Sequence, residues 1–301
     1  MDIGIALPHM GAEASPALIT SFAQEAERLG YASLWAGERL LRPRHFVAYG
    51  HPSNPTPEHF KNVYDPLETL SYIAAKTERI KLGTSVINAF FHVPVVLGRR
   101  FATLDQFSQG RVIAGIGQGW MKDEFDTANV PWQRRGNGFE DYIAALRAVW
   151  GPDPVEYEGR HYRIIESDIG PKPLQPHGPP LLLGTSTPAL LERAARLADG
   201  INPVARSWDA LEQIAHEFPE RVQQAGRNPQ AMQIIVRSNG QISASPLPES
   251  RPPLSGSLEQ IREDIQRLAG LEITHVFFDF VATPVNDQMS MLEKLRRATE
   301  I

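Results

Sequence analysis

The feature of this sequence that most limits its possible folds is a regular alternation of short β-branched runs with amphipathic helical segments. We predict eight strands, at residues 3–7, 33–36, 81–87, 112–116, 180–183, 200–202, 233–236 and 275–278. Strands that alternate with helices form a parallel sheet, and eight parallel strands close into a barrel. A barrel of this kind commonly accommodates about 300 residues as one domain. We therefore predict an α/β fold, a (β/α)8 TIM barrel, formed as a single domain over residues 1–301.

The segments between the strands carry helix start signals. A side chain that can cap a helix stands directly before a proline at Ser15-Pro16, Asp65-Pro66 and Thr187-Pro188. Proline is favoured at the first helical position, where its missing N–H costs nothing. These three pairs predict three helix N-termini.

Three insertions interrupt the minimal barrel pattern, at residues 38–64, 117–179 and 239–256. Each follows a strand end, so we predict that they lie on the C-terminal face, where barrel enzymes carry their chemistry. The second insertion contains a helix of its own at about residues 139–150. The third is rich in serine and proline, and we expect it to be mobile.

Composition excludes several classes of function. The chain has no cysteine, which rules out disulfides, thiolate metal sites and cysteine nucleophiles. Its net charge of −5, with both signs interspersed, argues against a nucleic-acid-binding surface. It has no signal-peptide pattern and no long apolar run, so we expect no membrane partner. These features favour a cytoplasmic enzyme that acts on a small molecule.

Common catalytic motifs are missing. The sequence has no phosphate-loop pattern GxxxxGK, no nucleophile elbow GxSxG and no metal pair HExxH. Gly115, Gly117 and Gly119 fail the dinucleotide fingerprint, because Trp120 stands where its last glycine belongs. Three histidines share the first insertion without the spacing of a ligand set, so we predict no metal site.

Three segments in a fixed order carry a family pattern. They read YDPLETLSYIAAKTERIKLGTSV (residues 64–86), RRFATLDQFSQGRVIAGIGQGWMKDEF (99–125) and WGPDPVEYEGRHYRI (150–164). Together they resemble the luciferase-like superfamily and, more closely, its branch that uses the deazaflavin coenzyme F420. The resemblance covers nearly the whole chain and implies a TIM barrel, a flavin-like cofactor and, commonly, a homodimer.

The resemblance implies a non-prolyl cis peptide at Ser85-Val86, which forms a bulge against the cofactor ring. The alternative is a plain barrel strand with Val86 directed inward. Non-prolyl cis peptides are rare because they cost roughly 2.5–4 kcal/mol.

Two loops are candidates for binding the cofactor phosphate. Glycines let the backbone of Gly117-Gln118-Gly119-Trp120 approach a ligand, although a tight turn would need them too. Gly184-Thr185-Ser186 opens a helix, whose unpaired N–H groups suit a phosphate. The resemblance implies that both loops border the phosphate. This chain departs from the resembled pattern at Trp120, because dehydrogenases of that branch often have a catalytic carboxylate at this position.

The candidate catalytic residues are Glu38, Arg39 and His9. Glu38 matches an acidic position near the hydride-transfer centre in the resembled family, whereas Arg39 replaces a histidine. An arginine stays protonated and cannot act as a base, but it can stabilise negative charge on a substrate. A structural Glu38–Arg39 pair is the alternative. His9 follows the first strand and could relay protons near neutral pH.

Further polar residues occur at the strand ends. Glu124 fits the family pattern or only braces its loop. Arg206, Arg237 and Asp279 follow the sixth, seventh and eighth predicted strands and are predicted to be rim residues. Arg237 is also a candidate for holding a substrate oxygen.

These observations predict an oxidoreductase that transfers a hydride between coenzyme F420 and a small organic substrate. An FMN-dependent monooxygenase on the same scaffold is the alternative. A non-catalytic flavin-binding barrel is a third hypothesis, against which the polar residues His9, Glu38, Arg39 and Asn88 argue. A cofactor-free hydrolase ranks last, because no nucleophile motif is present.

Overall fold

A computed structural model describes residues 1–185, 187–280, 283 and 285–299 of the chain. Eight parallel strands form its centre: β1 (Asp2–Ala6), β2 (Ser33–Ala36), β5 (Lys81–Thr84), β7 (Val112–Gly117), β10 (Leu181–Leu183), β11 (Gly200–Ile201), β12 (Gln233–Ser238) and β13 (His275–Phe278). Neighbouring strands pair in the order β10-β11-β12-β13-β1-β2-β5-β7. Strand β10 also pairs with β7, so the sheet closes on itself. The predicted (β/α)8 barrel is confirmed.

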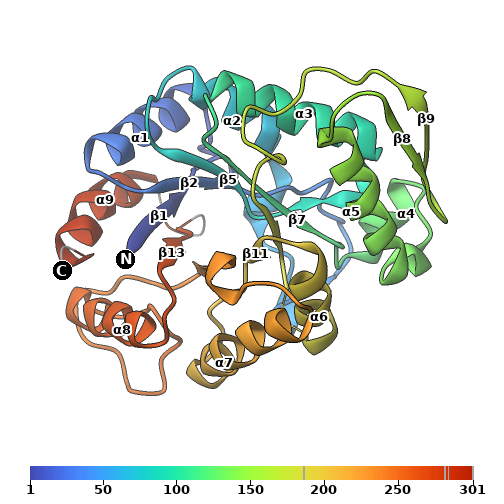
Figure 1. Ribbon diagram of the computed structural model, residues 1–301. Coiled ribbons are helices and arrows are strands. Elements are labelled where there is room, and N and C mark those ends of the chain that lie inside the picture. The colour runs from blue at the N-terminus through green and yellow to red at the C-terminus, as the bar shows by residue number, and fades with distance from the viewer. Residues whose placement is uncertain (186, 281–282, 284, 300–301) are drawn as a thin grey trace.

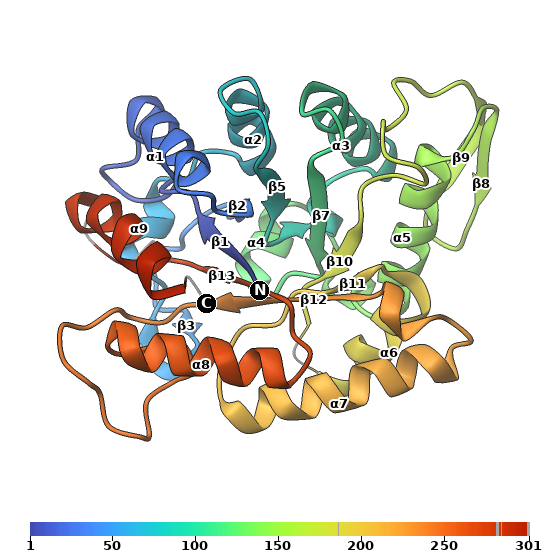
Figure 2. The ribbon, with the colours of Figure 1, turned by 60° about the vertical axis from the view of Figure 1, so that its left-hand side comes forward.

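Helices surround the closed sheet, as Figure 2 shows. Those that alternate with the barrel strands are α1 (Pro16–Arg28), α2 (Pro66–Ala74), α3 (Pro94–Phe107), α5 (Asn137–Trp150), α6 (Pro188–Leu197), α7 (Trp208–Gln224), α8 (Leu258–Gly270) and α9 (Val285–Thr299). Short 3-10 turns occur at η1 (Glu58–Lys61), η2 (Ala89–Phe91), η3 (Trp132–Arg134) and η4 (Pro229–Ala231). Among the described residues, no helix is both long and apolar enough to cross a bilayer.

Two of the three predicted helix caps form. The Ser15 side chain accepts a hydrogen bond from the N–H of Leu18 at 3.3 Å. The Asp65 side chain accepts one from the N–H of Leu67 at 3.0 Å. Thr187 stands at the N-cap position of α6, but its side chain makes no capping bond. The start of α6 therefore lacks a side-chain cap.

The predicted strand 81–87 is divided in two. Strand β5 ends at Thr84, and β6 (Ile87–Asn88) then pairs with the end of β7 at Ile116 and Gly117. The peptide bond between Ser85 and Val86 is cis. The bulge implied by the resemblance is therefore present, and it explains the interruption of the strand.

Side chains that point into the barrel form a separate small core. Its buried members are Ala6, Trp35, Ile113, Leu182, Ile235 and Phe277, each from a different strand. The rings of Trp35 and Phe277 stack with their centroids 4.5 Å apart. The Trp35 indole N–H donates to the Ser33 hydroxyl at 2.7 Å, so the one polar atom of the ring is satisfied. The barrel interior is thus filled with side chains.

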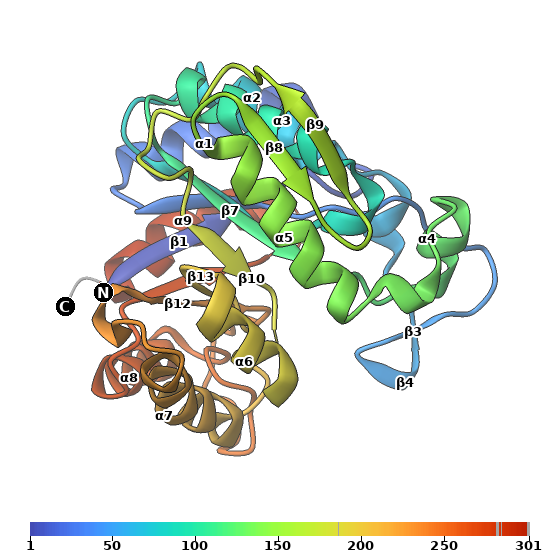
Figure 3. The same ribbon diagram turned by 45° about the vertical axis from the view of Figure 1, so that its right-hand side comes forward.

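The insertions extend the carboxyl ends of the strands. After β2 the chain forms the hairpin β3 (Ala48–Tyr49) and β4 (His51–Pro55), and after β7 it forms α4 (Lys122–Thr127). Figure 3 shows this hairpin and α4 projecting on the same side of the barrel. The later part of the second insertion differs, because it follows α5. It forms the hairpin β8 (Val155–Glu158) and β9 (Arg163–Ser167), which lies along α5.

The end of the third insertion is anchored to helix α8, and the mobility expected from the composition of the segment stays a prediction. The guanidinium of Arg251 pairs with the carboxylate of Asp264 on α8 at 2.5 Å. The side chain of Leu254 is fully buried, and its N–H donates to the same carboxylate at 2.6 Å. Serine and proline content did not reveal these contacts, because they depend on one ion pair and one apolar side chain.

The inner core predicts a large loss of stability for Phe277→Ala. We expect the free energy of unfolding to fall by about 3–5 kcal/mol, because truncation of a buried ring leaves a cavity. The control is Phe46→Ala, since the Phe46 side chain is 59% exposed. This change should stay within about 0.5 kcal/mol of the wild type. Urea and thermal unfolding measure the free energy of unfolding of both variants. Equal losses of stability would contradict the assignment of Phe277 to the inner core.

Candidate active site at the barrel mouth

The bulge at Ser85-Val86 is held by hydrogen bonds from the ends of three other strands of the barrel. The N–H of Ser85 donates to the carbonyl of Ala36, at the end of β2, at 2.8 Å. Its hydroxyl donates to Asn202 Oδ1, just after β11, at 2.6 Å. Its carbonyl accepts from Arg237 Nη1, on β12, at 3.2 Å. The position of the bulge is therefore fixed across the whole width of the barrel mouth.

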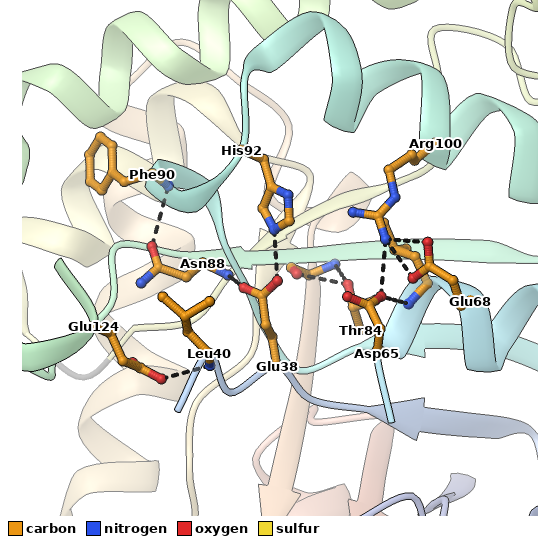
Figure 4. Close-up of polar contacts among 12 residues, drawn as sticks. Glu38, Leu40, Asp65, Glu68, Thr84, Asn88, Phe90, His92, Arg100 and Glu124 are labelled. Carbon is orange, nitrogen blue, oxygen red and sulfur yellow. Dashed lines mark hydrogen bonds and ion pairs between the residues drawn. The ribbon is translucent and has the colours of Figure 1, made fainter. Parts of the chain in front are cut away.

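Glu38 holds the chain on the other side of the bulge. Its carboxylate accepts the N–H of Asn88 at 2.7 Å and contacts His92 Nε2 at 2.7 Å (Figure 4). Its own N–H donates to the carbonyl of Val86 at 3.3 Å. The side chains of Glu38 and His92 are 10% and 14% exposed. This geometry makes Glu38 a positioning residue for the bulge.

Arg39 has a different set of partners. Its guanidinium pairs with Glu124 at 3.3 Å and lies over the rings of Phe60 and Trp120, 5.2 and 5.3 Å from their centroids. Glu124 is buried and also accepts the N–H of Leu40 at 2.9 Å (Figure 4). Burial raises the pKa of the Glu124 carboxyl. The alternative of a Glu38–Arg39 pair is thus wrong, because each residue has its own partner.

His9 is buried beneath the mouth. Its Nδ1 contacts the carbonyl of Leu7 at 2.8 Å, and its Nε2 lies 2.9 Å from the carbonyl and 3.0 Å from the N–H of Gly37. A neutral ring either donates from Nδ1 to Leu7 and accepts from the Gly37 N–H, or donates from Nε2 to the Gly37 carbonyl. Burial lowers the pKa of His9, which favours this neutral form. In this arrangement His9 supports the backbone next to Glu38, and its proton-relay role stays a prediction.

Arg237 and Asp279 form an ion pair beside His9. Their closest nitrogen and oxygen lie 2.5 Å apart. The Arg237 guanidinium also contacts Ser85 and Asn239, and its role in holding a substrate oxygen stays a prediction. His59 lies close enough for its pKa to respond to Asp279, Arg237 and His9, although partial burial is the main cause of its lowered pKa. Arg206, the third predicted rim residue, is exposed.

Glycines surround the bulge where larger residues would not fit. A Cβ atom at Gly117 would lie 2.7 Å from Val86 Cγ2, and one at Gly184 would lie 3.1 Å from Val86 Cγ1. A Cβ atom at Gly119 would lie 2.1 Å from Asn88 Nδ2, and its φ of +73° itself favours glycine. The two predicted phosphate loops therefore meet at the bulge, with their backbones close to it.

The other residues of the first loop point in different directions. Gln118 Oε1 accepts the N–H of Gly136 at 2.6 Å, so this side chain joins the loop to the start of α5. Trp120 is 36% exposed, and its ring centroid lies 5.6 Å from that of Tyr49 in the β3–β4 hairpin. Trp120 thus covers part of the mouth.

Two buried polar atoms beside the bulge have no partner. Among the described residues, four buried side-chain nitrogen or oxygen atoms lack a hydrogen bond, and two of them are Asn88 Nδ2 and Thr185 Oγ1. A buried polar group without a partner is costly, so it is often completed by a ligand or water. These two donors and the surrounding glycines fit a cofactor that carries oxygen acceptors. Ser186, also predicted to bind the cofactor, lies outside the described residues.

Sequence analysis missed two residues that hold the site together. His92 is paired with Glu38, 54 positions earlier in the chain, and Asn202 bonds Ser85 from 117 positions later. Neither belongs to a recognisable motif. The only signal available was that Asn202 is the last residue of a predicted strand and that His92 follows the end of another.

Comparison with known proteins gives a consistent family. Residues 1–246 match the family described as luciferase-like monooxygenase. An uncharacterized protein of Mycobacterium tuberculosis is 28% identical over 277 residues, 91% of this chain and 90% of its own length. An F420-dependent glucose-6-phosphate dehydrogenase of Amycolatopsis mediterranei is 28% identical over 189 residues, 62% of this chain and 52% of its own. An FMNH2-dependent dimethylsulfone monooxygenase of Pseudomonas putida is 31% identical over 135 residues, 44% and 37% of the two chains.

Solved structures share the fold. The monooxygenase RslO1 from Streptomyces bottropensis has a TM-score of 0.81 at 21% identity, over 99% of this chain and 98% of its own. The coenzyme F420-dependent tetrahydromethanopterin reductase from Methanopyrus kandleri has a TM-score of 0.78 at 19% identity, over 100% and 98% of the two chains. The architecture thus occurs both in a monooxygenase and in a coenzyme F420-dependent reductase.

The position of Glu38 predicts a stability effect for Glu38→Ala. We expect the free energy of unfolding to fall by about 1–3 kcal/mol, because the N–H of Asn88 loses its acceptor. Glu38→Gln keeps an acceptor oxygen and should lose less. Glu249→Ala, at an exposed position, is the control. Chemical denaturation measures all three, and an unchanged Glu38→Ala variant would mean that the carboxylate does not hold the bulge.

Proposed function

Because the chain belongs to the luciferase-like monooxygenase family, we propose that it transfers a hydride between the deazaflavin coenzyme F420 and a small organic substrate. The observation that carries the proposal is the pair of unpartnered buried atoms, Asn88 Nδ2 and Thr185 Oγ1, beside the glycine-lined bulge. Support for the deazaflavin comes from the sequence match with the F420-dependent dehydrogenase.

The residues at the mouth then have separate tasks. The bulge at Ser85-Val86 supports the ring system, and Gly117, Gly119 and Gly184 let the backbone approach the phosphate. The bound deazaflavin supplies two-electron hydride chemistry at its C5 carbon, while the protein contributes orientation and electrostatics. The hydroxyl of Thr185 donates to the cofactor phosphate.

Arg39 is the residue that we assign to the substrate. Glu124 and the two rings under its guanidinium hold this cation at the mouth, and its side chain is 18% exposed. A fixed guanidinium stabilises negative charge that develops on a substrate oxygen. Trp120 shields the same space from water. Glu38 positions the bulge through the N–H of Asn88, and His9 supports the backbone at Gly37 and is the candidate proton relay.

An FMN-dependent monooxygenase is the second candidate. The match with the FMNH2-dependent dimethylsulfone monooxygenase favours it, at 31% identity over a shorter stretch. Both cofactors carry a phosphate and a flat ring system, so the bulge and the two loops serve either. Binding preference therefore separates the two candidates.

Titration of the purified protein tests the proposal. We expect oxidised coenzyme F420 to bind at least about tenfold more tightly than oxidised or reduced FMN. Cofactor fluorescence or absorbance measures the binding. Preference for reduced FMN with oxygen uptake would make the protein a monooxygenase. Binding of neither would refute the cofactor site.

The variant Thr185→Val tests the phosphate contact in the same titration, and Thr187→Val is its matched control. We expect an affinity for the deazaflavin about fivefold lower, because one hydrogen bond is lost. Thermal stability should be unchanged or higher, since the hydroxyl has no partner within the protein. Thr187→Val changes an exposed threonine two positions later and should leave both quantities unchanged.

A homodimer and a cytoplasmic location are part of the same proposal. Apolar side chains are exposed on neighbouring helices, with Tyr72 on α2 and Val93 and Val96 at the start of α3. We expect light scattering to give twice the chain mass for the wild type, and Val96→Glu to give a monomer because a buried charge opposes association. Phe46→Glu, on another exposed apolar residue, is the control. A monomeric wild type would contradict the proposed dimer.

A further inference from the structure

A positively charged pocket lies at the start of α5. Its lining residues are Pro131, Gln133, Arg134, Arg135, Gly136, Asn137, Gly138, Arg160 and His161, and it has a volume of about 570 Å³. Three of these side chains are arginines, and a fourth can carry a positive charge. In a chain with a net charge of −5, this concentration of cationic groups is unusual.

Two distant parts of the sequence form the pocket. Arg134 and Arg135 precede α5, whereas Arg160 and His161 belong to the turn of the β8–β9 hairpin. Asp141, in the first half of α5, fastens this turn by accepting the N–H of His161 and the hydroxyl of Tyr157, each at 2.6 Å. The cationic groups are thus held together by the fold.

The arginines of the pocket have no acidic partner among the described residues. The neighbouring acids are committed elsewhere, because Glu140 pairs with arginines on α6 and Glu158 pairs with Arg163. Arg134 and Arg135 instead lie over the rings of Tyr162 and Trp132, 5.4 and 4.2 Å from the ring centroids. Unpaired guanidiniums on aromatic supports are well suited to hold carboxylates or phosphates.

The pocket adjoins the proposed phosphate loop. Gly136, one of its lining residues, donates its N–H to Gln118 of that loop at 2.6 Å. Gly136 also stands at the N-cap of α5 and offers no capping side chain, so the positive end of the helix dipole is directed to the same place. An anionic group that continues beyond the phosphate would therefore meet this pocket.

We propose that the pocket binds the carboxylates that coenzyme F420 carries beyond its phosphate, and that it thereby selects the deazaflavin over FMN. This inference rests on the proposed function and adds the residues that recognise the far end of the cofactor. FMN ends at its phosphate, so it has no group for Arg134, Arg135 and Arg160 to bind.

The test compares two deazaflavins, coenzyme F420 with its glutamyl tail and a truncated form that ends at the phosphate. Dissociation constants are measured by fluorescence for the wild type and for the triple variant Arg134→Gln, Arg135→Gln, Arg160→Gln. We expect the triple variant to bind the complete cofactor about tenfold more weakly and the truncated form unchanged. Added salt should weaken the wild type's binding of the complete cofactor more than that of the truncated form.

Two further variants guard against indirect effects. Arg160→Gln alone changes an exposed side chain and should give a smaller loss in the same direction. Arg163→Gln removes an arginine of the same hairpin that pairs with Glu158 and does not line the pocket, so it should bind like the wild type. Unfolding temperatures of all variants establish that they are folded.

The outcomes separate the two levels of the proposal. If the wild type binds both deazaflavins equally well, the pocket has no role and the proposed function still stands. If the triple variant weakens both equally, the pocket holds the phosphate itself and the inference is wrong. If the wild type binds neither deazaflavin, the proposed function fails and the inference fails with it.

Discussion

The mouth of the barrel depends on the hydrogen bonds that fix the bulge at Ser85-Val86. Donors and acceptors reach it from the ends of β2, β11 and β12, through Ala36, Asn202 and Arg237. Glu38 secures the following residues by binding the N–H of Asn88. Because these bonds join strands from opposite sides of the barrel, the closed sheet determines where the bulge lies. The glycine loops and the unpartnered donors are arranged around that fixed point.

Two adjacent residues, Glu38 and Arg39, have different partners and different roles at this site. Glu38 is directed to the bulge and His92, whereas Arg39 is directed to Glu124 and the aromatic rings at the mouth. Separate partners keep one carboxylate for structure and one guanidinium near the solvent. Arg39 is thus an ordered polar group at the mouth.

The sequence predicted the elements of the fold better than the partners within the site. The eight strands and the caps at Ser15 and Asp65 depend on local pattern, so they could be located from neighbouring residues alone. The bulge was anticipated through resemblance. By contrast, the contacts of Gln118 with Gly136 and of Arg251 with Asp264 join residues that become neighbours only after folding. Composition alone suggested mobility for the second of these segments, because it does not show the ion pair of Arg251 with Asp264.

Selection between two related cofactors requires a contact with a part that only one of them has. In the proposed function the bulge and the glycine loops serve the ring and the phosphate, which a deazaflavin and FMN share, so these elements would give little discrimination. The β8–β9 hairpin lies outside this common region and brings Arg160 beside Arg134 and Arg135. Charge on such a hairpin can change without disturbing the barrel, since Asp141 fastens the turn through the N–H of His161 and the hydroxyl of Tyr157 rather than through its arginines. A conserved architecture and a variable cofactor preference are therefore compatible within one scaffold.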